Sequence, residues 1–201
     1  MRLFVYSRTK EARQAPDIIV SIDPGLKTTG IAILNKVNAT VSMSAFEWPD
    51  INIAKTYLPD LILHIRYTVR QVIKDIIKKF KETIDCIIEF PHITGEYAVG
   101  MSMLCTTWLH ELFRVRTVRN VIFIQNKVPE FFMRKRSVTS LETVYYARET
   151  LPRFVPPKEV ATHAYDALLY LLFVYFDWFS AFIKEGTVRK PVPEIVSLTW
   201  K

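Results

Sequence analysis

The chain has 201 residues, of which 50% are hydrophobic and 13% aromatic, and its formal net charge at pH 7 is +7. This length and this apolar content predict one globular domain with a sizeable core and exclude an intrinsically disordered chain. The positive charge, with a pI of about 9.4, favours a polyanionic partner, nucleic acid before a membrane surface.

Two sequence features bear on the cellular compartment and on membranes. Cys86 and Cys105 have neither CxxC nor zinc-ligand spacing, and no secretory leader is present, so we expect free thiols and an intracellular, reducing compartment. The longest apolar stretch, residues 167–176, is shorter than the roughly 20 residues that a membrane-spanning helix needs. We therefore expect a buried helix there and no membrane partner.

The first strong element is a strand at residues 18–23, which is preceded by a basic segment with its own short strand or arm. Its nearly continuous β-branched run is typical of a strand buried on both faces. The strand ends in Asp23 and is followed at once by the turn residues Pro24 and Gly25. Residues 31–34 then predict a second strand that folds back on the first as a hairpin.

The following elements indicate an α/β fold. Residues 39–46 alternate as expected of a third antiparallel strand, and apolar spacings of three and four predict a long amphipathic helix over residues 57–80. The chain continues with a strand, a helix, a strand and a helix over residues 83–89, 96–115, 121–125 and about 137–149. This order predicts a mixed sheet of three antiparallel strands followed by two parallel strands, flanked by helices.

Two of the later elements carry further polar residues. The fourth strand ends in Glu89, which Pro91 follows closely. The last helix is predicted to begin near Lys158, and it carries His163 and Asp166 before a long apolar run. Residues three apart share a helix face, so His163 and Asp166 are expected to point toward one site.

Each of these residues also has an ordinary structural interpretation. Asp23 could be a turn residue, and Glu89 could leave the core at the strand end and meet solvent. His163 and Asp166 could form a hydrogen-bonded structural pair. The joint pattern is more specific than its parts, because one sheet can bring two strand ends and one helix start together.

Such a convergence points to metal ions. Crowded carboxylates repel one another and have raised pKa values unless a cation neutralises them. Hard carboxylate oxygens suit Mg²⁺ or Mn²⁺ rather than zinc. Two such ions, roughly 4 Å apart, can activate a water molecule and stabilise the leaving oxygen in phosphodiester hydrolysis. The pattern therefore predicts nuclease chemistry.

The order of the motifs resembles the RuvC family of Holliday-junction resolvases, within the ribonuclease H-like superfamily. The motifs are IDPG with TG shortly after it, IIEFP and HAYDALLYLL, at residues 22–25, 29–30, 87–91 and 163–172. The resemblance covers about residues 17–176 and implies a ribonuclease H-like mixed sheet. It divides the chain into a basic N-terminal extension, a nuclease domain and a C-terminal tail, at residues 1–16, 17–183 and 184–201.

The resemblance also implies roles for the site residues. Asp23, Glu89 and Asp166 would hold two metal ions, with His163 as a further ligand or as a proton-transfer group, since its unperturbed pKa lies near physiological pH. Membership would imply a homodimer, whose two-fold symmetry matches that of a four-way junction and provides two active sites for paired nicks.

Contacts with DNA are assigned from charge and from the same resemblance. The family carries a glycine-rich, lysine-containing turn before the penultimate helix, whereas this chain has no glycine between Met101 and Phe182 and carries a basic segment instead. Phosphate contacts are expected from Lys127, Arg134, Lys135 and Arg136. In the family, the loop after the second acidic residue approaches the junction, so the candidates for stacking on unpaired bases are Phe90, His92 and Tyr97. Phe90 could instead be a core residue.

The sequence thus predicts a metal-dependent, structure-selective endonuclease that resolves branched DNA. One alternative is a nuclease of the same fold that acts on other DNA or on RNA:DNA hybrids. Another is a non-catalytic nucleic-acid-binding protein that retains the fold. The N-terminal extension and the C-terminal tail could clamp DNA arms or could simply be solvated.

Overall fold

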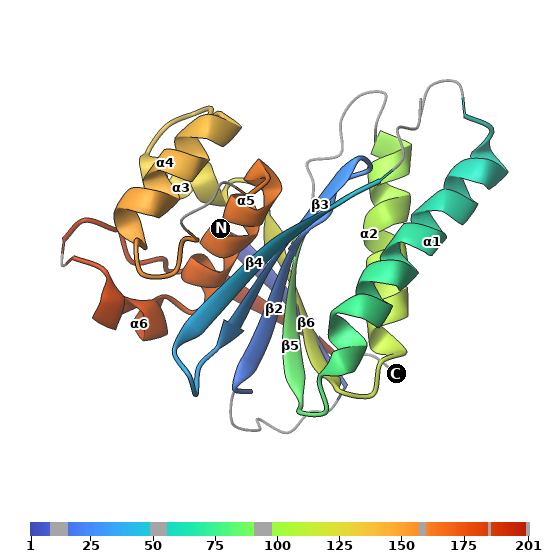
Figure 1. The fold of residues 1–201 in the computed structure, drawn as a ribbon, viewed down its shortest axis with the longest axis horizontal. Coiled ribbons are helices and arrows are strands. Elements are labelled where there is room, and N and C mark those ends of the chain that lie inside the picture. The colour runs from blue at the N-terminus through green and yellow to red at the C-terminus, as the bar shows by residue number, and fades with distance from the viewer. Residues whose placement is uncertain (9–15, 49–55, 91–97, 157–159, 185, 200–201) are drawn as a thin grey trace.

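The β-branched run that ends in Asp23 forms β2 (Ile18–Asp23), inside a seven-stranded mixed sheet (Figure 1). The computed structural model describes residues 1–8, 16–48, 56–90, 98–156, 160–184 and 186–199. The other strands are β1 (Arg2–Ser7), β3 (Thr28–Asn35), β4 (Thr40–Glu47), β5 (Ile84–Phe90), β6 (Val118–Gln125) and β7 (Glu194–Thr199). Across the sheet their order is β4-β3-β2-β5-β6-β1-β7.

The predicted five-stranded core is confirmed, and two further strands extend it. β4, β3 and β2 pair antiparallel, whereas β5 is parallel to β2 and β6 is parallel to β5. Beyond β6, β1 pairs antiparallel to β6, and β7 pairs parallel to β1. The two ends of the chain therefore build one edge of the sheet, although the sequence predicted no element for the tail.

Helices cover both faces of the sheet (Figure 1). One face carries α1 (Leu58–Asp75) and α2 (Ala98–Phe113). The other carries α3 (Val128–Met133), α4 (Ser140–Thr150), α5 (Thr162–Val174) and α6 (Phe176–Phe179). Short 3-10 turns follow α1 and α6, at Ile77–Lys79 and Ser180–Phe182.

Three predicted helix boundaries are wrong for local reasons. The helix expected over residues 57–80 ends at Asp75, where the chain tightens into a 3-10 turn before β5. α4 begins at Ser140 rather than near residue 137, because Thr139 caps it in a reciprocal capping box with Glu142. α5 begins at Thr162 rather than near residue 158. The short helix α3 was not predicted.

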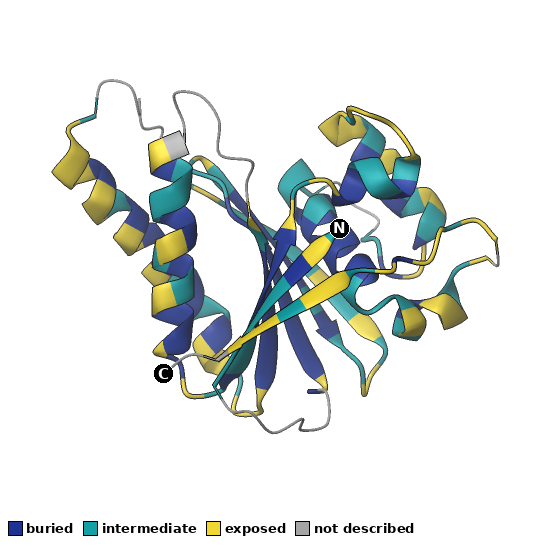
Figure 2. Ribbon diagram, turned by 180° about the vertical axis from the view of Figure 1, so that it is seen from behind, coloured by how far each residue is buried: buried dark blue, intermediate teal, exposed yellow. Residues whose placement is uncertain are grey.

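Alternation along β2 divides the core into two layers. Ile19 packs in the layer beneath α5, whereas Ile18, Val20 and Ile22 pack in the layer beneath α1 and α2. Every residue of β2 is buried, and Figure 2 shows the same for the centre of the sheet. Asp23 has the same parity as Ile19, so its side chain stands on the α5 face.

α5 is the buried helix that the apolar stretch predicts. Nine of its residues are buried, and it crosses β3 and β2 at the centre of the sheet. In the described part of the chain no single helix is long and apolar enough to span a membrane. α5 together with the segment up to Phe182 passes such a test on length and composition, but this pair is bent by 97°.

Both cysteines are free and buried, as predicted. Burial, with the nearby charges of Glu89 and Asp23, raises the pKa of Cys105 to about 12. Burial and the charge of Asp85 likewise raise the pKa of Cys86. Both thiols are therefore protonated packing groups rather than nucleophiles.

The start of α5 lies against β3 at Gly30. A Cβ atom on Gly30 would lie 2.1 Å from the carbonyl carbon and 2.2 Å from the carbonyl oxygen of His163. These are backbone atoms, so no side-chain rotation relieves the clash. The glycine of the TG motif therefore sets how closely the helix that carries His163 and Asp166 can approach the sheet.

The Gly30→Ala variant should be less stable by about 1–3 kcal/mol, because the added methyl group overpacks a backbone contact. Chemical denaturation followed by circular dichroism measures this difference. The matched control is Ser42→Ala at an exposed position of β4, which should leave the midpoint nearly unchanged. Equal midpoints for Gly30→Ala and the parent chain would show that this contact does not constrain α5.

Candidate active site

The strand register places two of the predicted acidic residues side by side. Ile22 of β2 pairs with Ile88 of β5, so Asp23 and Glu89 end two adjacent parallel strands. Carboxyl ends of parallel strands meet at one edge of a sheet, which is where ligand sites of α/β proteins form. Asp23 is only 4% exposed, so its carboxylate needs partners in the protein or a cation.

The first turns of α5 bring the other two predicted residues to the same place. One ligand atom from each of Asp23, His163 and Asp166 lies within 4.8 Å of the others. Nδ1 of His163 lies 2.5 Å from Oδ2 of Asp23. The structure thus joins groups that stand 140 positions apart in the sequence.

Hydrogen bonds tie Glu89 and Asp166 into this group. The protonated Glu89 carboxyl donates to Asp23 and accepts from the Tyr170 hydroxyl. The Thr143 hydroxyl of α4 donates to Asp166. Tyr170 and Thr143 are each 2% exposed, so packing fixes the donors that orient the two carboxyl groups.

The pKa values of all three carboxyl groups are raised, chiefly by burial. The pKa of Asp23 rises to about 7, with the charge of Asp166 adding to the effect of burial. The pKa of Asp166 also rises to about 7, with the charge of Glu89 adding to it. The pKa of Glu89 lies well above its ordinary value, because the Asp23 charge and hydrogen bond reinforce burial. The group is therefore poorly stabilised as a set of anions.

This donor set fits a divalent cation. Three carboxyl groups and one imidazole offer hard oxygen ligands and one nitrogen, which suits Mg²⁺ or Mn²⁺. A cation held by Asp23, Glu89 and Asp166, with His163 at the side, would supply the positive charge that these buried groups lack. The His163 side chain is 42% exposed, so the group is open to solvent on that side.

The cavity at the site contains residues that the sequence interpretation missed. Its volume is about 250 Å³, and α3 and α4 supply the wall opposite β2 and β5. The missed lining residues are Asn126, Pro129, Glu130, Val138, Ser140, Thr143 and Tyr170. Spacing could have revealed Tyr170, since it follows His163 by seven positions and Asp166 by four on one helix face. Asn126 follows the end of β6, as Glu89 ends β5.

The predicted basic residues surround α3 at the mouth of this side of the molecule. Lys127 precedes α3, and Arg134 ends it in a left-handed conformation with φ 55° and ψ 37°. Lys135 forms an ion pair with Glu142 of the α4 capping box. Lys127, Arg134, Lys135 and Arg136 are all exposed. Their contact with phosphates stays a prediction.

The predicted aromatic residues are placed only in part. Phe90 is 46% exposed and packs edge-on against Phe123, at a ring distance of 5.9 Å. It lines an apolar cavity of about 270 Å³ beside α2, on the face opposite to that of Glu89. The interpretation of Phe90 as a fully buried core residue is therefore wrong, whereas His92 and Tyr97 lie outside the described residues.

Comparison with solved structures identifies the fold. Thermus thermophilus RuvC in complex with a Holliday junction substrate matches with a TM-score of 0.50 and 16% identity, over 87% of this chain and 99% of that chain. A structure of Thermus thermophilus RuvC matches with a TM-score of 0.48 and 15% identity, over the same shares. No protein-family model matches this sequence, and neither does the sequence of any curated protein. The chain therefore has the RuvC-type ribonuclease H-like fold that its motifs predict.

The raised carboxyl pKa values predict a pH-dependent stability that metal removes. In the metal-free protein the folded state binds more protons than the unfolded state between the ordinary Asp pKa of about 4 and the folded value of about 7. The free energy of unfolding should therefore fall as pH rises through this window and level off above it. Mn²⁺ should stabilise the protein more at about pH 8 than at about pH 5, because it replaces protons as the neutralising charge.

Denaturation midpoints with EDTA and with Mn²⁺, at both pH values, measure this effect. Asp23→Asn/Asp166→Asn is the control, since amides neither titrate nor repel, and it should lose most of the difference. An equal response to Mn²⁺ in the parent and in this control would show that the ion binds elsewhere.

Proposed function

We propose that this protein is a metal-dependent, structure-selective endonuclease that resolves branched DNA by hydrolysing phosphodiester bonds. The observation that carries the proposal is the convergence of Asp23, Glu89, His163 and Asp166 at the carboxyl edge of the sheet. The substrate is inferred from the fold, since the matched Thermus thermophilus RuvC was solved with a Holliday junction. The net charge of +7 agrees with a polyanionic substrate.

Asp23, Glu89 and Asp166, with His163, would hold Mg²⁺ or Mn²⁺, and two ions per site suit this number of carboxyl groups. Such ions lower the pKa of bound water and stabilise the oxygens that attack and leave phosphorus. The chain's own contribution is orientation. Tyr170 and Thr143 hold the carboxyl groups of Glu89 and Asp166 in place through their hydroxyl hydrogens.

His163 is suited to proton transfer at the open side of the site. Its Nδ1 contacts Asp23, which fixes the orientation of the ring, and its side chain is 42% exposed. A histidine in this position can exchange a proton with water or with the leaving oxygen near neutral pH.

DNA would reach the site past α3 and α4. Lys127, Arg134 and Arg136 would position the backbone through phosphate contacts, while Phe90, His92 and Tyr97 are the candidates for stacking on unpaired bases. We further propose a homodimer, because two sites related by a two-fold axis match the symmetry of a four-way junction and its paired nicks.

The test is cleavage of synthetic substrates by the purified protein with Mg²⁺ or Mn²⁺. A four-way junction should be nicked at paired positions and a linear duplex should remain intact. Asp23→Asn should still bind the junction but cut it more than about a hundredfold more slowly, since it removes a metal ligand. Asp60→Asn, at an exposed position of α1, is the matched control and should cut normally.

The substrate panel also separates the alternatives. Preferential cleavage of an RNA:DNA hybrid would replace junction resolution with a hybrid-directed nuclease activity. Binding to DNA with no cleavage of junctions, flaps, forks or hybrids under either metal would support a non-catalytic nucleic-acid-binding protein and sink the endonuclease proposal.

A further inference from the structure

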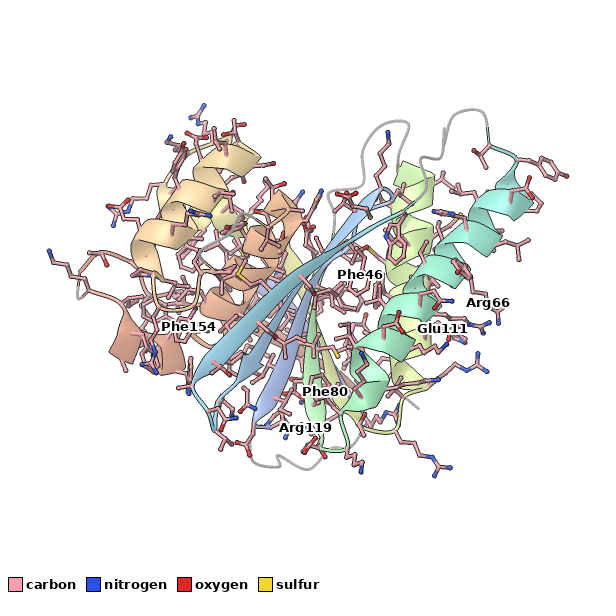
Figure 3. All side chains as sticks on the ribbon, viewed as in Figure 1. Phe46, Arg66, Phe80, Glu111, Arg119 and Phe154 are labelled. Carbon is pink, nitrogen blue, oxygen red and sulfur yellow. The ribbon has the colours of Figure 1, made fainter. Side chains whose placement is uncertain are left out.

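A second charged surface lies on the opposite face of the sheet, along the outer side of α1 and α2. It contains two hollows, of about 520 Å³ and about 490 Å³, that share Glu111. We call these two hollows together the helix-pair groove. Figure 3 shows Arg66 and Glu111 on this outer side, across the sheet from α5. The cations that line the groove are Arg66, Arg70, Lys74, Lys78, His110 and Arg114.

Three guanidinium groups converge on one carboxylate oxygen at the centre of the groove. Oε1 of Glu111 lies 3.8 Å from Arg66, 3.2 Å from Arg70 and 3.7 Å from Arg114. The Glu111 side chain is only 10% exposed, whereas the three arginine side chains are 46–58% exposed. One negative charge thus holds three positive charges in place, and a guanidinium carries five N–H donors. The arginines keep charge and donors to offer to a ligand.

The cations of α1 form a regular row. Arg66, Arg70, Lys74 and Lys78 recur at intervals of four residues, with Lys78 in the turn that directly follows the helix. Residues four apart lie on one helix face and are separated by about 6 Å along the axis. This interval is close to the separation of successive phosphates along a nucleic-acid strand. Among the described residues that line the groove, Glu111 is the one carboxylate.

A row of lysines on a helix is often only a solvated face, but two observations go further here. The arginines are drawn together around a nearly buried carboxylate, although their like charges repel one another. The row also borders real hollows between two helices rather than a convex surface. An acidic protein segment would match the charge, but the regular interval of the cations favours a ligand with evenly spaced negative charges.

We propose that the helix-pair groove binds the sugar-phosphate backbone of a nucleic-acid strand. The contact would be independent of base sequence, since arginine and lysine recognise phosphate oxygens by charge and hydrogen bonding. The groove lies on the face opposite to Asp23, so it would hold a part of the nucleic acid distant from the bond that is cut. This proposal does not depend on the cleavage activity proposed above.

The test compares two double variants of the full chain, in EDTA so that no cleavage occurs. Lys74→Gln/Lys78→Gln removes two charges from the groove without touching the Glu111 cluster. Arg2→Gln/Lys190→Gln removes two exposed cations that already pair with Glu194 and Asp177. The probe is a fluorescent single-stranded oligonucleotide, titrated at several salt concentrations, and mass spectrometry maps which lysines the oligonucleotide protects from acetylation.

The groove variant should bind about tenfold more weakly or worse, with a salt slope lower by roughly two, because each lost phosphate contact reduces the slope by about one. The control should bind within about twofold of the parent chain, and the oligonucleotide should protect Lys74 and Lys78 in the parent. Equal losses in both variants would reduce the effect to overall charge and overturn the proposal. So would unchanged binding with no protection of these lysines.

A competition experiment separates nucleic acid from an acidic protein partner. Poly-glutamate of similar charge should displace the oligonucleotide only weakly. If poly-glutamate binds as tightly and protects the same lysines, the groove is a site for acidic proteins and the nucleic-acid proposal falls. Because every measurement is made without metal, a protein that cuts no junction would leave these outcomes interpretable.

Discussion

The mutual repulsion of the carboxyl groups of Asp23, Glu89 and Asp166 in a poorly solvated place is the constraint on which the rest of the structure depends. Burial raises all three pKa values, so the folded chain holds these groups together at a cost in stability. Two buried parallel strands and a buried helix provide the rigidity for this, and Gly30 provides the close approach between β3 and α5. A site under such strain is typical of function rather than of packing.

The sequence was most informative where chemistry follows local pattern. The β-branched run before Asp23, the strand that ends at Glu89 and the three-residue spacing of His163 and Asp166 predict both the elements and the side of the sheet. Pairing between distant segments was not predictable in the same way. β7 pairs with β1 across about the whole length of the chain, and nothing in either segment specifies the other. Glu130 and Asn126 enter the site through the path of the chain around α3, which leaves no periodic signal.

The two faces of the sheet have different electrostatic character. The α5 face gathers acidic groups into one cavity, whereas the α1 and α2 face gathers cations around Glu111. An acidic site repels a nucleic-acid backbone unless metal ions intervene, so basic surfaces must supply much of the binding energy. The residues around α3 do this beside the site, and the helix-pair groove is placed to do it at a distance. The chain thus separates chemistry from attachment.

The central claim is that the four converging residues form a metal centre, and diffraction from crystals that contain Mn²⁺ tests it most directly. Data collected near the manganese absorption edge would locate the ions by their anomalous signal. The account predicts an anomalous peak bound by carboxylate oxygens of Asp23 and Asp166, with Glu89 and His163 in its coordination shell. An ordered, empty cluster in crystals saturated with Mn²⁺ would contradict it.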